Sequence, residues 1–185
     1  AHRVILACGA IERTLVFANN DRPGGMLASA VQAYVNRYAV LPGNRAVIFT
    51  NNDSAYHVAA DMISAGIEIA SIVDSRTKPG NASRKLVGNT QILANHVVAR
   101  AVGRRRVRAV IVRSSENGSA KSIPCDLLCV SGGWNPTVDL FSQSRGTLRY
   151  EEALAAFIPH EAVQDCCCVG AAVGIFELQQ ILADG

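Results

Sequence analysis

The sequence lacks the features that would direct it to a membrane or to nucleic acid. No apolar run among its 185 residues approaches the ~20 residues that a transmembrane helix needs, and its start does not read as a signal peptide. The formal net charge of +3 is too small to indicate binding to nucleic acid or to a membrane surface. We therefore expect a cytoplasmic protein. Because Ala1 runs almost directly into an apolar stretch, we also expect this chain to be a piece of a longer polypeptide.

The sequence also lacks the residue spacings of metal and redox sites. It has six cysteines, but no Cys-x-x-Cys pair. Cys166, Cys167 and Cys168 are adjacent, which matches no zinc spacing. The remaining cysteines lie in apolar runs, where cysteine is usually a small buried hydrophobic residue. Since no paired general acid and base or activated nucleophile is evident either, we expect reduced cysteines, no metal site and no catalytic residue in this chain.

Aromatic residues are few, at 5% of the chain, whereas 49% of the residues are hydrophobic, a balance that suits a parallel α/β protein. The apolar run 46–50 predicts a strand, and the spacing over 55–65 predicts a helix. A second apolar run over 67–73 ends in Asp74. This strand–helix–strand unit has the proportions of a dinucleotide-binding βαβ unit, and Asp74 stands where such units place the acceptor for a ribose hydroxyl.

The turn of this unit lacks the glycines of a dinucleotide fingerprint. Thr50, Asn52 and Ala55 stand where Gly-x-Gly-x-x-Gly would have its glycines. Asn52 puts a side chain where a phosphate should contact backbone. Asp53 puts a negative charge at the start of the helix, where it should be a good cap and a poor neighbour for a phosphate. We expect a nucleotide-type unit with a modified phosphate turn that binds NAD weakly or not at all in this chain.

The remaining patterns indicate an α/β fold with a small antiparallel meander beside the parallel sheet. Apolar spacing predicts helices near both ends, and alternating runs within 90–113 predict the meander. Three consecutive arginines inside it read as a solvated turn rather than a phosphate patch. The predicted elements outside the βαβ unit are strands at 4–8, 123–130 and 156–158 and helices at 26–39 and 173–183.

Two of the predicted strands run into glycine turns, and small residues there let a ligand approach the backbone closely. If the carboxyl ends of these strands line one crevice, the residues nearest a nucleotide are Gly9, Ala10, Gly132, Gly133 and Trp134. Two plainer interpretations stay open: an ordinary glycine between strand and loop, and a tryptophan that is simply part of the core.

Four segments carry a resemblance to a known family. VILACGAIER, FANNDRPGGMLASA, TNNDSAY and SGGWNPTVDLFSQS together resemble the alpha subunits of heterotetrameric sarcosine oxidases. More broadly, the layout is similar to the two-dinucleotide-fold flavoproteins and pyridine-nucleotide-disulfide reductases. That resemblance implies an inserted NAD-type Rossmann-like domain at 42–121. It also implies an incomplete outer FAD/NAD(P)-binding-type domain, made of 1–41 and 122–185.

The resemblance further implies an enzyme that oxidatively demethylates sarcosine to glycine, passes the one-carbon unit to tetrahydrofolate and reduces oxygen to hydrogen peroxide. Its beta, gamma and delta subunits would be the partners, with NAD in this module and FAD, FMN and tetrahydrofolate in the full enzyme. One alternative is a noncatalytic assembly module with a degenerate dinucleotide site. Another is an NAD(P)H-dependent flavin oxidoreductase domain, against which the missing redox cysteine pair and the missing glycines argue.

Overall fold

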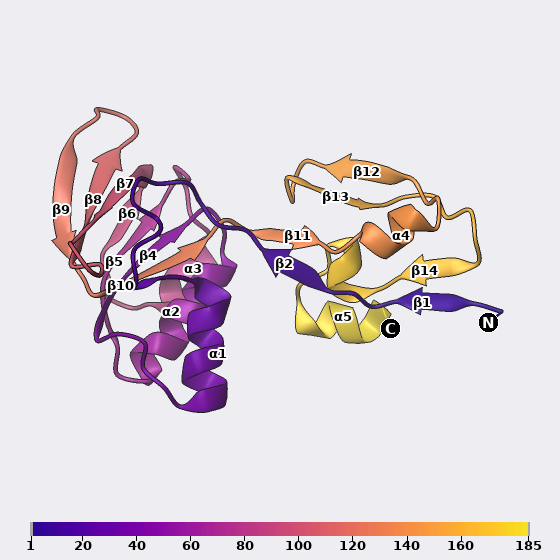
Figure 1. Ribbon diagram of the computed structural model, residues 1–185, viewed down its shortest axis with the longest axis horizontal. Helices are drawn as coiled ribbons and strands as arrows, with labels where there is room; N and C mark the ends of the chain where they lie inside the picture. Colours follow the sequence, from indigo (N-terminus) through magenta and orange to yellow (C-terminus); the bar gives the residue numbers. More distant parts are fainter. Residues whose placement is uncertain (1, 185) are drawn as a thin grey trace. The chain divides into compact units, whose positions relative to one another are not determined.

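The computed structural model describes residues 2–184, and the chain forms two compact units (Figure 1). We call Thr14–Gly133 the central unit. The terminal unit consists of the chain up to Arg13 together with the chain from Trp134 onward. The central unit extends past both limits of the inserted segment 42–121 expected from the sequence, because strands on either side of that segment pair into its sheet.

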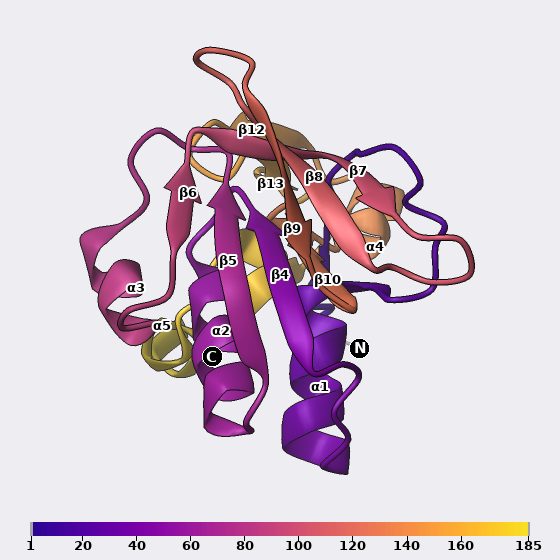
Figure 2. The ribbon, with the colours of Figure 1, turned by 90° about the vertical axis from the view of Figure 1, so that its left-hand side faces the viewer.

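The central unit is built on a five-stranded sheet whose neighbouring strands are all parallel (Figure 2). The predicted βαβ unit is confirmed within it, and nearly every residue of its first strand is buried, as expected for a strand covered on both faces. In sheet order, the strands are β3 (Gly25–Leu27), β10 (Leu127–Ser131), β4 (Arg45–Thr50), β5 (Glu68–Asp74) and β6 (Ile92–Ala94).

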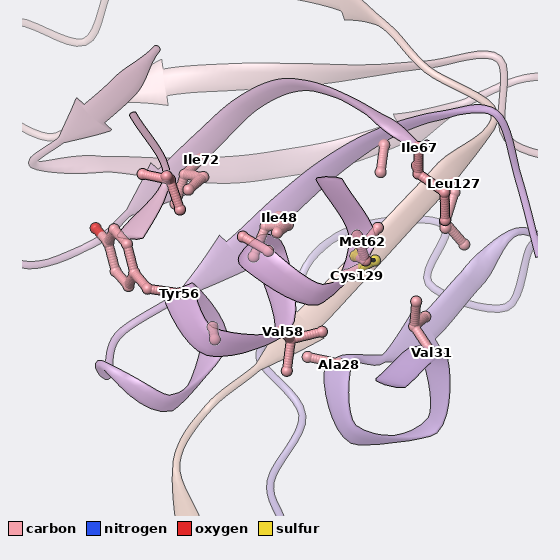
Figure 3. Close-up of a cluster of buried hydrophobic side chains, with 14 residues drawn as sticks. Ala28, Val31, Ile48, Tyr56, Val58, Met62, Ile67, Ile72, Leu127 and Cys129 are labelled. Carbon is pink, nitrogen blue, oxygen red and sulfur yellow. Dashed lines mark hydrogen bonds between the residues drawn. The ribbon is translucent and has the colours of Figure 1, made fainter. Parts of the chain in front are cut away.

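Helices cover one face of this sheet. They are α1 (Ala28–Tyr38), α2 (Ser54–Ser64) and the short α3 (Asn81–Leu86). Successive side chains of a strand point to opposite faces, so Ile48 of β4 packs toward the helices. Figure 3 shows it in the cluster with Val58 and Met62 of α2 and with Cys129 of β10.

A three-stranded antiparallel sheet covers the other face, where Val47 and Phe49 of β4 pack against its valines. Its strands are β7 (His96–Val102), β8 (Ala109–Ser114) and β9 (Ala120–Pro124), in that order. This confirms the predicted meander, with the three arginines at the β7–β8 turn. The run at 91–93 is not part of it, because β6 pairs parallel with β5 at the edge of the main sheet.

The single strand predicted over 123–130 is divided in two. β9 ends at Pro124, and β10 begins at Leu127 in a different sheet. Proline has no N–H for a ladder. The next two residues donate their backbone N–H groups to different partners, Cys125 to Arg108 O at 3.1 Å and Asp126 to Arg45 O at 3.0 Å. These two bonds carry the chain from one sheet to the other.

The terminal unit contains three two-stranded sheets. A parallel pair joins β1 (Val4–Leu6) to β14 (Cys166–Cys168), and antiparallel pairs join β2 (Ala10–Glu12) to β11 (Trp134–Pro136) and β12 (Leu148–Glu151) to β13 (Ala156–Pro159). Its helices are α4 (Asp139–Gln143), the 3-10 turn η1 (Gly170–Val173) and α5 (Leu178–Asp184). The predicted helix over 173–183 begins later than expected, because Gly174 takes a φ of 84° and ends η1.

None of the helices within residues 2–184 combines the length and the apolar character that crossing a bilayer requires.

Candidate functional site

The candidate site lies at the carboxyl edge of the central sheet. β4 lies between β5 and β10, which is where the strand order of the sheet reverses. Thr50 at the end of β4 pairs in register with Asp74 on one side and with Ser131 on the other. Ligands of open parallel sheets bind outside the carboxyl ends of the strands at such a reversal. The tertiary structure therefore brings three sequence-predicted features together: the turn after β4, Asp74 and the glycines after β10.

Both polar atoms of the Asn52 side-chain amide form hydrogen bonds within the protein. Nδ2 donates to the carbonyl O and to Oγ of Ser131, both at 3.1 Å, which ties the turn to the end of β10. Oδ1 accepts from the backbone N of Ser54 at 3.1 Å and from its hydroxyl at 2.6 Å. Thr50 Oγ1 holds the backbone of the turn, because it accepts from Asn52 N and donates to Asn52 O, each at 3.1 Å. The role of Asn52 in cofactor binding stays a prediction.

Asp53 does not cap the helix with its side chain, so that prediction is wrong. It occupies the position before α2, but its carboxylate makes no capping hydrogen bond. The preceding Asn52 supplies the acceptor instead, through Oδ1. The Asp53 carboxylate turns toward Arg76, whose Nη2 lies 2.6 Å from Oδ1. A strong guanidinium–carboxylate bond is thus made in place of a local cap.

Asp74 is fully buried at the end of β5. Its Oδ1 accepts from the backbone N of Arg76 at 2.9 Å and from Arg76 Nε at 3.1 Å. Its Oδ2 accepts from Arg76 Nη2 at 2.8 Å and from the Tyr56 hydroxyl at 2.9 Å. A buried carboxylate is tolerated only when it is paired and hydrogen-bonded. Both oxygens of Asp74 are therefore engaged inside the protein, and its contact with a ribose stays a prediction.

Sequence reasoning missed Tyr56 and Arg76, the two partners of Asp74. Burial raises the pKa of Tyr56 above its ordinary value, and the nearby Asp74 carboxylate raises it further. Burial lowers the pKa of Arg76, but hydrogen bonds to Asp74 and Asp53 outweigh that effect, so the guanidinium stays charged. The one signal available in the sequence was a cation two residues after the acid, because an arginine near that acid can accommodate a phosphate in dinucleotide folds.

The predicted glycine contacts divide between the two units. Gly132 and Gly133 are buried after β10 in the central unit, and Gly133 has a φ of 89°. Gly9 and Ala10 belong to the terminal unit. Gly9 has a φ of 73°, and a Cβ there would meet nothing within 4 Å, so backbone conformation rather than crowding favours glycine at this position. That these glycines share one nucleotide crevice stays a prediction.

Trp134 begins β11 in the terminal unit and is half-buried. Its indole packs on Phe176, with ring centroids 6.4 Å apart and a tilt of 35° between the rings. The indole therefore takes part in aromatic packing of that unit, as the plainer interpretation expects. Its proximity to a nucleotide stays a prediction.

The three consecutive cysteines form β14, and each is half-buried and free. Within residues 2–184, no three His, Cys, Asp or Glu side chains are grouped so that they could hold a metal ion.

Comparison with solved structures identifies the fold class of this chain. A crystal structure of T. acidophilum thioredoxin reductase matches the whole chain with a TM-score of 0.79 at 18% identity, and the match covers 62% of that chain. L-proline dehydrogenase from P. horikoshii matches 94% of this chain with a TM-score of 0.67 at 26% identity, over 30% of its own chain. The chain has a thioredoxin reductase-like α/β fold, which confirms the predicted fold class.

The particular relatives are sarcosine oxidase alpha subunits. The protein from Corynebacterium sp. (strain P-1) is 39% identical over 192 residues, and the match covers 100% of this chain. The one from Rhizobium meliloti (strain 1021) is 35% identical over 185 residues. No family model matches. The chain is thus homologous over its whole length to one segment of sarcosine oxidase subunit alpha, which confirms the resemblance. It spans 20% of the length of the first of these relatives and 18% of that of the second.

Proposed function

We propose that this chain is part of the alpha subunit of an enzyme that oxidatively demethylates sarcosine to glycine. The enzyme passes the one-carbon unit to tetrahydrofolate and reduces oxygen to hydrogen peroxide, with FAD and FMN as its flavins. Its beta, gamma and delta subunits are the partners of this chain, in the cytoplasm. The observation that carries this proposal is the 39% identity to a sarcosine oxidase subunit alpha along the whole chain.

The role of this segment is to bind NAD rather than to catalyse a reaction. The proposed contacts are Gly9, Ala10, Gly132, Gly133 and Trp134. The positive φ angles of Gly9 and Gly133 and the position of Gly133 beside the strand-order reversal support it. Small residues allow the close backbone approach that a dinucleotide requires.

This role assigns the two domains as the sequence suggested. The proposed outer dinucleotide-binding domain comprises 1–41 and 122–185, and 42–121 is the proposed inserted NAD-type domain. Within the outer segments, 14–41 and 122–133 pack with the inserted domain in the central unit. Asn52 and Asp74 are the candidate contacts of the inserted domain. A nucleotide at that position has to replace hydrogen bonds that Ser131, Tyr56 and Arg76 now supply.

The assembled enzyme provides the test, with two glycine substitutions in the alpha subunit. Gly133 and Gly66 have φ angles of 89° and 90°, so Gly133→Ala and Gly66→Ala impose similar backbone strain. We expect Gly133→Ala to lower the NAD content of the purified enzyme, measured by chromatography after denaturation, and Gly66→Ala to leave it unchanged. Equal NAD content in both variants would contradict the assignment. Sarcosine-dependent release of hydrogen peroxide tests the reaction, and its absence from the assembled enzyme contradicts it.

A noncatalytic assembly module is the second candidate, and the βαβ unit favours it. Its polar side chains are engaged within the protein: Asn52 bonds Ser131, Asp53 bonds Arg76, and Asp74 bonds Tyr56. Calorimetric titration of the 185-residue chain with NAD and with ADP tests whether the turn after β4 binds a nucleotide. We expect weak or no binding, because the polar side chains of this turn are already hydrogen-bonded within the protein. Sub-micromolar binding would contradict our interpretation of Asn52 and Asp53.

A further inference from the structure

Arg76 joins the turn after β4 to the end of β5 through two carboxylates. Its Nη2 lies 2.6 Å from Asp53 Oδ1 and 2.8 Å from Asp74 Oδ2. The Asp74 side chain is 0% exposed, whereas Asp53 is 47% exposed and Arg76 30% exposed. Arg76 thus has one fixed partner in the interior and one partner at the surface that a ligand can compete for.

This arrangement coincides with the two phosphate-recognition features of a dinucleotide fold. The first is the start of the helix after the first strand, where backbone N–H groups and the helix dipole favour an anion. The second is an arginine near the end of the second strand, which accommodates the 2′-phosphate of NADP. Here Asp53 lies directly before α2, an 11-residue helix, and Arg76 follows β5. The salt bridge between Asp53 and Arg76 therefore places a carboxylate of the chain itself at both positions where a phosphate would bind.

Gly80 has no side chain and therefore leaves room for the Asp53 carboxylate. A Cβ built on Gly80 would lie 2.6 Å from Asp53 Oδ2, so a larger residue at position 80 would displace that carboxylate. The three charged groups also carry one net negative charge, from two carboxylates and one guanidinium. An incoming phosphate thus meets repulsion from Asp53 and finds the guanidinium already bonded.

We propose that Asp53 acts as a built-in anion, which pairs with Arg76 in place of a nucleotide phosphate and closes this turn to phosphorylated ligands. Asp53 is then the residue that determines specificity, and Arg76 is a latent phosphate-binding group. The proposal goes beyond the proposed function, because it concerns only the turn between β4, α2 and β5. It holds whichever amine the assembled enzyme oxidises, and it favours the glycine contacts over Asn52 and Asp74 as the place where NAD binds.

The test is a calorimetric titration of the 185-residue chain with ADP as the probe. Asp53→Asn and Asp53→Ser remove the built-in charge, and Asp53→Asn combined with Arg76→Gln removes the proposed phosphate-binding group as well. We expect both single variants to bind ADP at least about tenfold more tightly than the unmodified chain. The double variant should lose that gain. Glu116→Gln removes one exposed negative charge elsewhere in the central unit and should change nothing.

A second readout does not depend on the Arg76 substitution, which leaves the buried Asp74 without its cation. Inorganic pyrophosphate should displace ADP from Asp53→Asn, because the opened site recognises phosphate. The proposal is overturned if Asp53→Asn and Asp53→Ser, folded by circular dichroism, bind ADP no better than the unmodified chain. It is equally overturned if the unmodified chain binds ADP and Arg76→Gln alone abolishes that binding. The NAD content of the assembled enzyme tests the proposed function separately.

Discussion

The Tyr56 hydroxyl donates a 2.9 Å hydrogen bond to the Asp74 carboxylate, and both residues are fully buried. The bond links the first turn of α2 to the end of β5, across 18 residues of sequence. It also completes the set of donors around a charge that has no access to water. A buried carboxylate that loses a donor carries a large desolvation cost.

Tyr56→Phe should therefore destabilise the central unit. It removes the hydroxyl and leaves the ring, so the loss reflects the hydrogen bond to Asp74 rather than packing. We expect the free energy of unfolding, measured in urea, to fall by about 1.5–3 kcal/mol, the range for hydrogen bonds to charged groups. Tyr38 is 60% exposed, and Tyr38→Phe is the matched control with little expected effect. Equal losses in the two variants would contradict this role of Tyr56.

Asp126→Asn should lower the free energy of unfolding at neutral pH and should lower it much less in acid. Asp126 Oδ1 accepts from the backbone N of Asn44 at 3.0 Å and of Arg45 at 2.9 Å. Burial raises the pKa of Asp126, but these backbone donors outweigh it and hold the pKa below its ordinary value. A lowered folded pKa contributes stability above the unfolded value of about 4, and this contribution disappears as the pH falls through the folded pKa.

The measurement is urea unfolding of both proteins from pH 7 downward. We expect the stability difference between unmodified protein and Asp126→Asn to be largest at neutral pH and to shrink below about pH 4. Asp165 has a side chain that is 70% exposed, so Asp165→Asn is the control, with a difference that stays near zero. A difference that does not change with pH would show that the charge of Asp126 is unimportant.

Met62→Ala should be among the most destabilising single changes in α2. Met62 is 0% exposed, and its sulfur lies 3.9 Å from Cys129 Sγ of β10, in the core between helix and sheet. Truncation of such a side chain leaves a cavity and costs about 2–5 kcal/mol. The next residue on the same helix, Ile63, is 41% exposed, and Ile63→Ala should cost much less. Thermal unfolding of the two variants side by side checks this order, and the reverse order contradicts it.

The Cys125 thiol should resist alkylation in the folded protein. It is 4% exposed, and burial, together with the charge of Asp126, raises its pKa to about 12. Because the thiolate is the reactive form, iodoacetamide at pH 8 should leave Cys125 unmodified until the chain is unfolded in guanidinium. Mass spectrometry of proteolytic fragments measures this. Cys8 is only half-buried and should be modified first. Modification of both at the same rate would contradict the burial of Cys125.

The βαβ unit was predictable from the sequence because its signals are local. The expected strand 46–50 is Arg45–Thr50, and the expected helix 55–65 is Ser54–Ser64. Short apolar runs and a 3.6-residue spacing are set by neighbours along the chain. The same signals failed where pairing between distant strands decides the structure. The run at 91–93 was expected in the antiparallel meander, yet its strand joins the edge of the parallel sheet.

The chemistry of the candidate site was predictable only in part. The missing glycines and the charge of Asp53 were visible in the sequence, but the direction of the Asp53 side chain was not. Sequence preference favours aspartate as a helix cap, whereas a guanidinium placed 2.6 Å away offers a stronger partner. That guanidinium comes from a residue 23 positions further along the chain.

Residue pattern alone thus established the α/β class, the position of the βαβ unit and the kinship with sarcosine oxidase alpha subunits, because local periodicity and residue identity are properties of the linear chain. The salt bridge between Asp53 and Arg76, which occupies the turn after β4, was decided only by the tertiary structure. The parallel register of β4 and β5 sets Thr50 beside Asp74 and so brings Arg76 between Asp53 and Asp74. Contacts of this kind depend on how two strands align, and strands that are buried on both faces have no alternating pattern to mark their register.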